Sequence, residues 1–224
     1  MNLSRRDEQL VEAMDDSNCD QGLFLRTHRQ LATINSLLCR WRWLYLHHIR
    51  SQCLPGQSYR LLDVGCGTGH LLITLADWAR QDQIDFEPIG IDLDARAFAI
   101  AASGLTLRQQ SIQDLAADNE TFDFVVCNHV LHHLPTNEIT EFLAAITAVT
   151  RRCAIVNDIA RSNFAYRTFP LVGCCFRNSW ILPDGLLSIR RSFTPHELLP
   201  LLPPAWRIQT LPPSRLVARY NASL

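Results

Sequence analysis

The sequence contains no lysine, so arginine supplies all 21 of its basic residues. A lysine general base and a lysine Schiff base are therefore excluded. Basic and acidic residues nearly balance, and the formal net charge at pH 7 is −1. Proteins that bind nucleic acid or anionic membranes usually carry a basic surplus, which this chain lacks. The composition favours neither of these as a partner.

Long apolar runs and paired cysteine motifs are missing too. No run of about 18 uncharged apolar residues exists, so we expect no membrane span. The segment Met1–Ser17 is of mixed charge and has no apolar signal core. The eight cysteines form no C-x-x-C pair and no zinc-ligand spacing. We therefore expect reduced thiols in a cytoplasmic protein.

The order of sequence patterns predicts one α/β domain. Two helical patterns, Gly22–Leu38 and Arg40–Gln52, precede a series of short apolar strands that alternate with helices. The predicted strands are Arg60–Gly65, Pro88–Asp92, Leu105–Gln109, Phe122–Asn128, Arg152–Asp158, Trp206–Leu211 and Arg215–Tyr220. The predicted helices are Gly69–Gln81, Ala95–Ala102, Asn137–Thr150 and Pro195–Leu202, the last with Thr194 as its N-cap and Glu197 completing a capping box.

The last two strands are separated only by Pro212, Pro213 and Ser214, which is too short for a crossover helix. They must pair antiparallel, so we expect a seven-stranded, mostly parallel sheet with a C-terminal antiparallel hairpin and helices on both faces. We divide the chain into an N-terminal helical arm or cap, residues 1–55, and a second domain, residues 56–224. Residues 160–187 fit neither period and end in Pro183-Asp184-Gly185, and we interpret them as a lid inserted on the carboxyl side of the strands.

A glycine-rich turn joins the first strand to its helix. Asp63 is followed by Gly65, Gly67 and Gly69, which permit a tight turn and close approach of a ligand at a helix N-terminus. Dinucleotide-binding proteins use the related pattern G-x-G-x-x-G, whereas here the third glycine comes one residue earlier. Asp92 ends the second strand, 23 positions after Gly69, where a carboxylate can accept the hydroxyls of an adenosine ribose. We interpret Asp94 instead as a helix N-cap.

Three features occur in the order found in one family. They are the turn motif, Asp92, and the segment from Phe122 to Leu134, which ends in Leu131-His132-His133-Leu134. Together they resemble class I methyltransferases that depend on S-adenosylmethionine, in particular small-molecule enzymes of the ubiquinone-biosynthesis type. Residues 156–158, 183–194 and 22–42 are also similar to a bacterial subgroup associated with type III polyketide synthases. The resemblance implies a Rossmann-like fold, S-adenosylmethionine as cofactor and a small-molecule acceptor.

The resemblance also implies a set of cofactor contacts. The glycines would hold the methionine side, Asp92 the ribose, and Ser111 with Ile112 the adenine, because Ser111 stands where the family commonly has an aspartate. The expected cofactor residues are Asp63, Gly65, Cys66, Gly67, Gly69, Asp92, Leu93, Ser111, Ile112 and Asn128.

Two histidines past the fourth strand are candidates for a general base toward a phenolic hydroxyl. We prefer His133 to His132, because the turn in this family usually buries its first histidine; packing of the turn is the alternative role. Substrate contacts are expected from Asn157, Asp158, Arg161 and Tyr166. Only Asp158 offers a carboxylate beside Asn128 and Asn157, so we do not expect a metal. For Arg190 and Arg191 we expect a solvated face or a pairing with Asp184.

The sequence thus predicts O-methylation of a phenolic or hydroxyquinone natural product. C-methylation of the same acceptors and a non-catalytic accessory subunit stay open, and a homodimer is compatible with the sequence. A nucleic-acid methyltransferase is disfavoured, because the fourth strand ends in Cys127-Asn128-His129-Val130 and lacks the Asn/Asp-Pro-Pro-aromatic motif.

Overall fold

The computed structural model describes residues 3–222, so the outermost residues of the two predicted domains, 1–2 and 223–224, lie outside it. Its single sheet has the strand order β3-β2-β1-β4-β5-β7-β6. The strands are β1 (Ser58–Val64), β2 (Asp85–Asp92), β3 (Thr106–Gln109), β4 (Phe122–Asn128), β5 (Thr150–Ile159), β6 (Trp206–Leu211) and β7 (Arg215–Asn221). The strands β1 to β5 pair in parallel, and β7 pairs antiparallel with β5 and β6. The predicted topology is confirmed.

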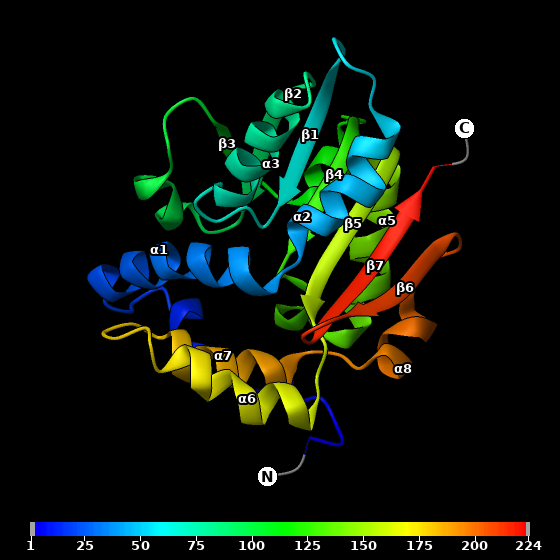
Figure 1. Ribbon diagram of the computed structural model, residues 1–224. Coiled ribbons are helices and arrows are strands. Elements are labelled where there is room, and N and C mark those ends of the chain that lie inside the picture. The colour runs from blue at the N-terminus through cyan, green and yellow to red at the C-terminus, as the bar shows by residue number, and fades with distance from the viewer. Residues whose placement is uncertain (1–2, 223–224) are drawn as a thin grey trace.

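Helices cover both faces of the sheet (Figure 1). They are α1 (Gln21–Leu38), α2 (Trp41–Leu44), α3 (His70–Gln81), α4 (Ile112–Ala117), α5 (Ile139–Val149), α6 (Asn163–Gly173), α7 (Ile181–Arg191) and α8 (Pro195–Leu198). One core includes Ile139 and Leu143 of α5, and the other includes Leu72 and Leu75 of α3. The central strands are buried on both faces, which explains why their sequences are almost continuously apolar.

The predicted helix over residues 40–52 is split into three short pieces. The helix α2 continues into a π-helical turn, Tyr45–Ile49, and then a 3₁₀ turn, Arg50–Gln52. Trp41, Leu44 and Tyr45 are nearly or fully buried in the same core as α3. Residues 39–53 therefore belong to the packing of the sheet, while α1 extends away from this core.

The insertion after β5 is more regular than we expected. It forms two packed helices, α6 and α7, and the Pro183-Asp184-Gly185 sequence lies within the beginning of α7 instead of ending the insertion. Proline is tolerated there because the first N–H groups of a helix have no intrahelical acceptor. A Cβ atom at Gly185 would lie 2.3 Å from the Phe169 ring, so this glycine lets the two helices approach closely.

Local capping signals predict the beginnings of several helices, although we overlooked one such signal. Thr194 accepts from the Glu197 N–H and forms the predicted capping box of α8. The helix predicted from Ala95 is a 3₁₀ helix, Ala95–Ile100, with Asp94 as its N-cap. The helix α4 was missed, although Ser111 and Asp114 form a second capping box. Over residues 3–222, no helix has the length and apolar character needed to cross a bilayer.

Candidate active site

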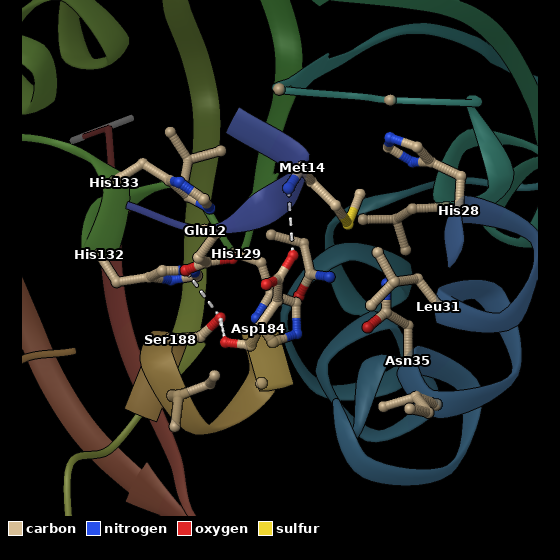
Figure 2. Close-up of a pocket in the computed structure, with 18 of the residues that line it drawn as sticks. Glu12, Met14, His28, Leu31, Asn35, His129, His132, His133, Asp184 and Ser188 are labelled. Carbon is tan, nitrogen blue, oxygen red and sulfur yellow. Dashed lines mark hydrogen bonds and ion pairs between the residues drawn. The ribbon is translucent and has the colours of Figure 1, made fainter. Parts of the chain in front are cut away.

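A cavity of about 950 Å³ lies at the carboxyl ends of the parallel strands. The loops after β1, β2 and β4 form one wall, and α1, α6 and α7 enclose the space from the other sides. In Figure 2, His28, Leu31 and Asn35 of α1 face a group formed by Glu12, His132 and His133 across this space. This is the position where open α/β sheets bind their ligands.

The glycine-rich turn forms the floor on the β1 side. Gly65 and Gly67 have positive φ angles of 70° and 52°, and both line the cavity with Cys66. The Gly67 N–H donates to Asp92 Oδ2 at 2.7 Å, which joins the turn to the end of β2. Gly69 does not line the cavity. Its φ is 72°, and a Cβ atom there would lie 2.4 Å from Leu105, so the packing of the turn requires glycine at this position.

Two carboxyl groups, the buried Asp63 and the half-buried Asp92, lie beside this turn without a cationic partner among the described residues. Asp63 is 1% exposed, and its Oδ1 atom has no hydrogen-bond partner within residues 3–222. Burial and the neighbouring Asp92 raise the pKa of Asp63, and burial also raises the pKa of Asp92. A cationic ligand would relieve both effects, whereas a pyrophosphate would worsen them. The pair therefore fits the ammonium and sulfonium groups of S-adenosylmethionine better than a nicotinamide dinucleotide.

The other expected cofactor residues differ in whether their hydrogen-bonding groups are already used within the protein. Ser111 uses its hydroxyl in the α4 capping box, donating to Asp114 Oδ2 and accepting from the Asp114 N–H. Ile112 is the first residue of α4, where the N–H lacks an intrahelical acceptor. Leu93 is 72% exposed next to Asp92, and Asn128 accepts from Trp41 Nε1 at 3.0 Å. All four line the cavity.

His132 and Asp158 form a buried pair at the opposite wall. His132 is 2% exposed, and its Nδ1 atom lies 2.7 Å from Asp158 Oδ1. The carboxylate also accepts the N–H groups of His132 and Ile159. Burial alone would raise the pKa of Asp158, but the His132 ring outweighs it and holds this pKa below its ordinary value. Since an ionised carboxylate only accepts, His132 Nδ1 donates to Asp158.

His133 is in a different environment. Its side chain is 33% exposed, and Nδ1 lies 3.2 Å from Asp15 Oδ1. Burial alone would lower the pKa of His133, but Asp15 and Glu12 raise it above its ordinary value. A histidine that holds its proton more firmly is a poorer base near neutral pH.

The N-terminal segment before α1 belongs to the expected arm or cap, and it contributes Glu12, Met14 and Asp15, which we had not named, to the cavity wall. Glu12 is 5% exposed, its Oε1 atom accepts from the Ser188 hydroxyl, and it lies 3.6 Å from His132 Nε2. The sequence of the N-terminal segment did not indicate that Glu12 is buried, because a mixed-charge segment has no apolar periodicity.

The expected pairing of Arg190 or Arg191 with Asp184 is wrong. Asp184 accepts the N–H groups of Ala13 and Met14, while Arg191 binds Asp15 at 2.8 Å and Arg190 binds Asp7 at 2.8 Å. Asp184 lies six and seven residues from these arginines, almost two helical turns away. Arg191 is also buried, so its face of α7 is not solvated.

None of the four expected substrate residues is among the side chains that line the cavity. Asn157 donates to the Cys39 carbonyl and accepts from Arg215. Each side-chain nitrogen of Arg161 already donates one hydrogen bond, to Leu3, Ser192 or Glu197. Asp158 lies behind His132, and Tyr166 lies on α6 outside the lining.

Two sets of donors are close enough to hold a metal ion, Glu12 with His132 and His133, and His129 with His132 and Asp158. In the second set Asp158 is already bound to His132 Nδ1, which fits a histidine–carboxylate pair as well as a ligand set.

The comparisons agree with this geometry. A sequence profile described as a methyltransferase domain matches residues 61–153. A ubiquinone biosynthesis O-methyltransferase from Methylocella silvestris is 31% identical over 171 residues, which cover 70% of this chain and 64% of the relative. Another from a Methylobacterium species is 30% identical, with 75% and 66% covered. The chain therefore spans slightly less than two thirds of the length of these relatives.

Solved structures show the same fold at low identity. A plantazolicin methyltransferase in complex with S-adenosylhomocysteine and a substrate analogue has a TM-score of 0.62 and 14% identity, with 88% of each chain covered. A protein from Pyrococcus horikoshii has a TM-score of 0.58 and 13% identity, with 87% of this chain and 92% of that protein covered.

Residues 61–153 thus match a methyltransferase domain, and the chain shares the fold of the plantazolicin methyltransferase. In sequence it is similar to the ubiquinone biosynthesis O-methyltransferases.

Proposed function

We propose that this chain methylates a hydroxyl oxygen of a small phenolic or hydroxyquinone acceptor. The observation that carries the proposal is the buried His132–Asp158 pair, whose histidine lines the cavity that also contains the glycine turn and Asp92. A cofactor site and a base for the acceptor thereby share one enclosed space.

In the proposed arrangement, S-adenosylmethionine supplies an activated methyl group, and the protein provides binding and orientation. Asp92 would accept the ribose hydroxyls through the lone pairs that the Gly67 and Asp94 N–H groups leave free. The unpartnered oxygen of Asp63 would accept from the ammonium group of the methionine end. Gly65, Cys66, Gly67 and Asn128 would border that end, and Leu93 and Ile112 the adenine.

We propose His132 as the general base in preference to His133. Asp158 accepts from His132 Nδ1, so that in the neutral ring Nε2 would be the atom that takes a proton, as in a histidine–aspartate pair of hydrolases. When His132 takes the proton of the acceptor hydroxyl, the negative charge of Asp158 stabilises the resulting imidazolium. His133 instead holds Asp15 and thereby keeps the N-terminal segment over the site.

The acceptor part of the cavity is apolar. Side chains of α6 and α7 line it, including Phe164, Phe169, Trp180 and Ile181. Such a wall suits an aromatic acceptor with an apolar substituent and excludes the water that would compete with the reaction.

The test has two stages. Thermal unfolding is measured with S-adenosylmethionine, S-adenosylhomocysteine and NADH in parallel, and we expect a shift with the two adenosyl compounds only. A ligand at a hundred times its Kd adds about 2.7 kcal/mol of stability. Methyl transfer from labelled cofactor to a panel of alkylphenols and hydroxyquinones is measured next, and NMR of the product distinguishes O-methylation from C-methylation. Cofactor binding without turnover on any acceptor would contradict the proposed function and favour an accessory subunit.

A further inference from the structure

Arg215 is a buried cation at the acceptor side of the site. It begins β7 and is 3% exposed. Because β7 runs antiparallel to β5, its first residue lies opposite Ile159, at the edge where the parallel strands end. Pro213, Ser214 and Arg215 all line the cavity.

The partners of Arg215 are all neutral. Its Nε donates to Asn157 Oδ1 at 2.9 Å, and one terminal nitrogen lies 3.3 Å from His129 Nε2. The other terminal nitrogen is buried without a partner, and within residues 3–222 no carboxylate oxygen lies within 4.0 Å of the guanidinium. The buried Arg161 and Arg191, in contrast, each bind a carboxylate. Arg215 thus leaves a charged donor unsatisfied, which is costly unless a ligand supplies the acceptor.

His129 lies beside Arg215 in this corner of the cavity, with its Nδ1 atom 4.0 Å from Asp158 Oδ1. Its φ of 62° is unusual for a residue other than glycine and turns the chain sharply after β4. Burial and the charge of Arg215 lower the pKa of His129 well below its ordinary value, so its ring is neutral. The neutral ring accepts at Nε2, where the Cys39 thiol also lies, at 3.2 Å. The nearby Asp158 is already bound to His132.

The position of Arg215 separates it from the cofactor contacts. Four strand intervals lie between β2, which ends in Asp92, and β7. At about 4.8 Å each, this places the two strands about 19 Å apart. Asp158 is paired with Leu216, the residue next to Arg215, so Arg215 lies close to the proposed base and not to the ribose site.

We propose that Arg215 recognises a carboxylate of the acceptor, placed next to the hydroxyl that is methylated. This inference rests on the proposed function and names its substrate class as hydroxyaryl carboxylates. A carboxylate supplies the acceptor atom that the free guanidinium nitrogen lacks, in a charge-assisted bond with defined geometry. The hydroxyl beside it would then face His132, and the apolar substituent would extend along α6 and α7.

The test compares two probes, 6-pentyl-2-hydroxybenzoate and its carboxamide, by calorimetric titration of the protein saturated with S-adenosylhomocysteine. The wild type should bind the carboxylate roughly 10- to 100-fold more tightly than the carboxamide, as expected for a bond to a charged group. R215Q should lose this preference, and R215K should retain part of it. R219Q is the matched control, because Arg219 is a half-buried arginine further along the same strand.

S-adenosylhomocysteine affinity and the unfolding midpoint are measured for each variant, so that a loss of fold is recognised. If R215Q does not fold, the inference is still tested by the preference of the wild type for the carboxylate and by its reduction in R215K. A wild type without preference for the carboxylate, including one that binds neither probe, would overturn the inference, as would a preference that R215Q retains. A preference for the carboxylate that depends on Arg215, without methyl transfer, would support carboxylate recognition and contradict only the proposed function. Methylation of neutral phenols alone would support the proposed function and contradict carboxylate recognition.

Discussion

His132 Nδ1 lies 2.7 Å from Asp158 Oδ1, and both side chains are at most 3% exposed. The aspartate does not line the cavity, so in the proposed reaction it would act through the orientation of the histidine. The neighbouring His133 lacks such a buried partner and is bound to the N-terminal segment instead. Adjacent histidines of one turn thereby acquire different tasks.

We expect D158N to lower kcat by about 10²- to 10⁴-fold, the usual contribution of a general base. The amide retains the shape of the carboxylate but favours the wrong tautomer of His132. Steady-state methyl transfer measures the effect, and calorimetry should give an unchanged affinity for S-adenosylhomocysteine. H133N is the comparison, because it leaves the His132–Asp158 pair intact. Equal losses in the two variants would show that His132 is not the base.

D92A should weaken S-adenosylmethionine binding by about 1–3 kcal/mol, the cost of losing a charge-assisted hydrogen bond. Titration calorimetry measures this change directly. D85A, at the exposed beginning of the same strand, serves as the control and should bind like the wild type. Near-normal affinity of D92A would refute the ribose assignment.

G69A should destabilise the fold more than it affects the cofactor. The alanine would have to adopt the positive φ of Gly69, and its methyl group would lie 2.4 Å from Leu105. Overpacking of this kind costs about 1–3 kcal/mol. G104A is the matched control: its φ is 91°, but no atom lies within 4 Å of the added methyl, so only the backbone strain remains. Urea unfolding should show the larger loss for G69A. A similar loss of unfolding free energy in both variants would mean that the Leu105 side chain moves away from the added methyl group at little cost.

Acid should loosen α1 over the cofactor site. Burial lowers the pKa of His28 to about 4 from 6.5, so the contribution of neutral His28 to stability is complete above pH 6.5. This contribution declines as the pH falls from 6.5 toward 4, by at most about 3 kcal/mol in total. The difference in unfolding free energy between the wild type and H28Q, measured from pH 8 to 4.5, isolates this group from the other histidines. A difference that does not vary with pH would show that His28 is not buried in its neutral form.

The sequence alone determined the fold and the position of the glycine turn and Asp92 at one edge of the sheet. Strand periodicity, the glycine turn and the capping boxes are local, because they depend on residues only a few positions apart, and each was readable from such a window. Asp92 followed from its place at the end of a strand. The short helix α4 was readable in the same way, from Ser111 and Asp114, and was overlooked.

The acceptor half was decided by tertiary structure. His132 meets Asp158 across 26 residues, His133 meets Asp15 across 118, and Glu12 meets Ser188 across 176. Such contacts arise because parallel strands deliver their carboxyl ends to one edge, where a distant N-terminal segment can also pack. No local pattern distinguishes a histidine held by a buried carboxylate from one at the surface. The physical reason is that burial and charge pairing are properties of the folded packing, and they decided which histidine is paired with the buried Asp158 and which arginine is buried without a carboxylate partner.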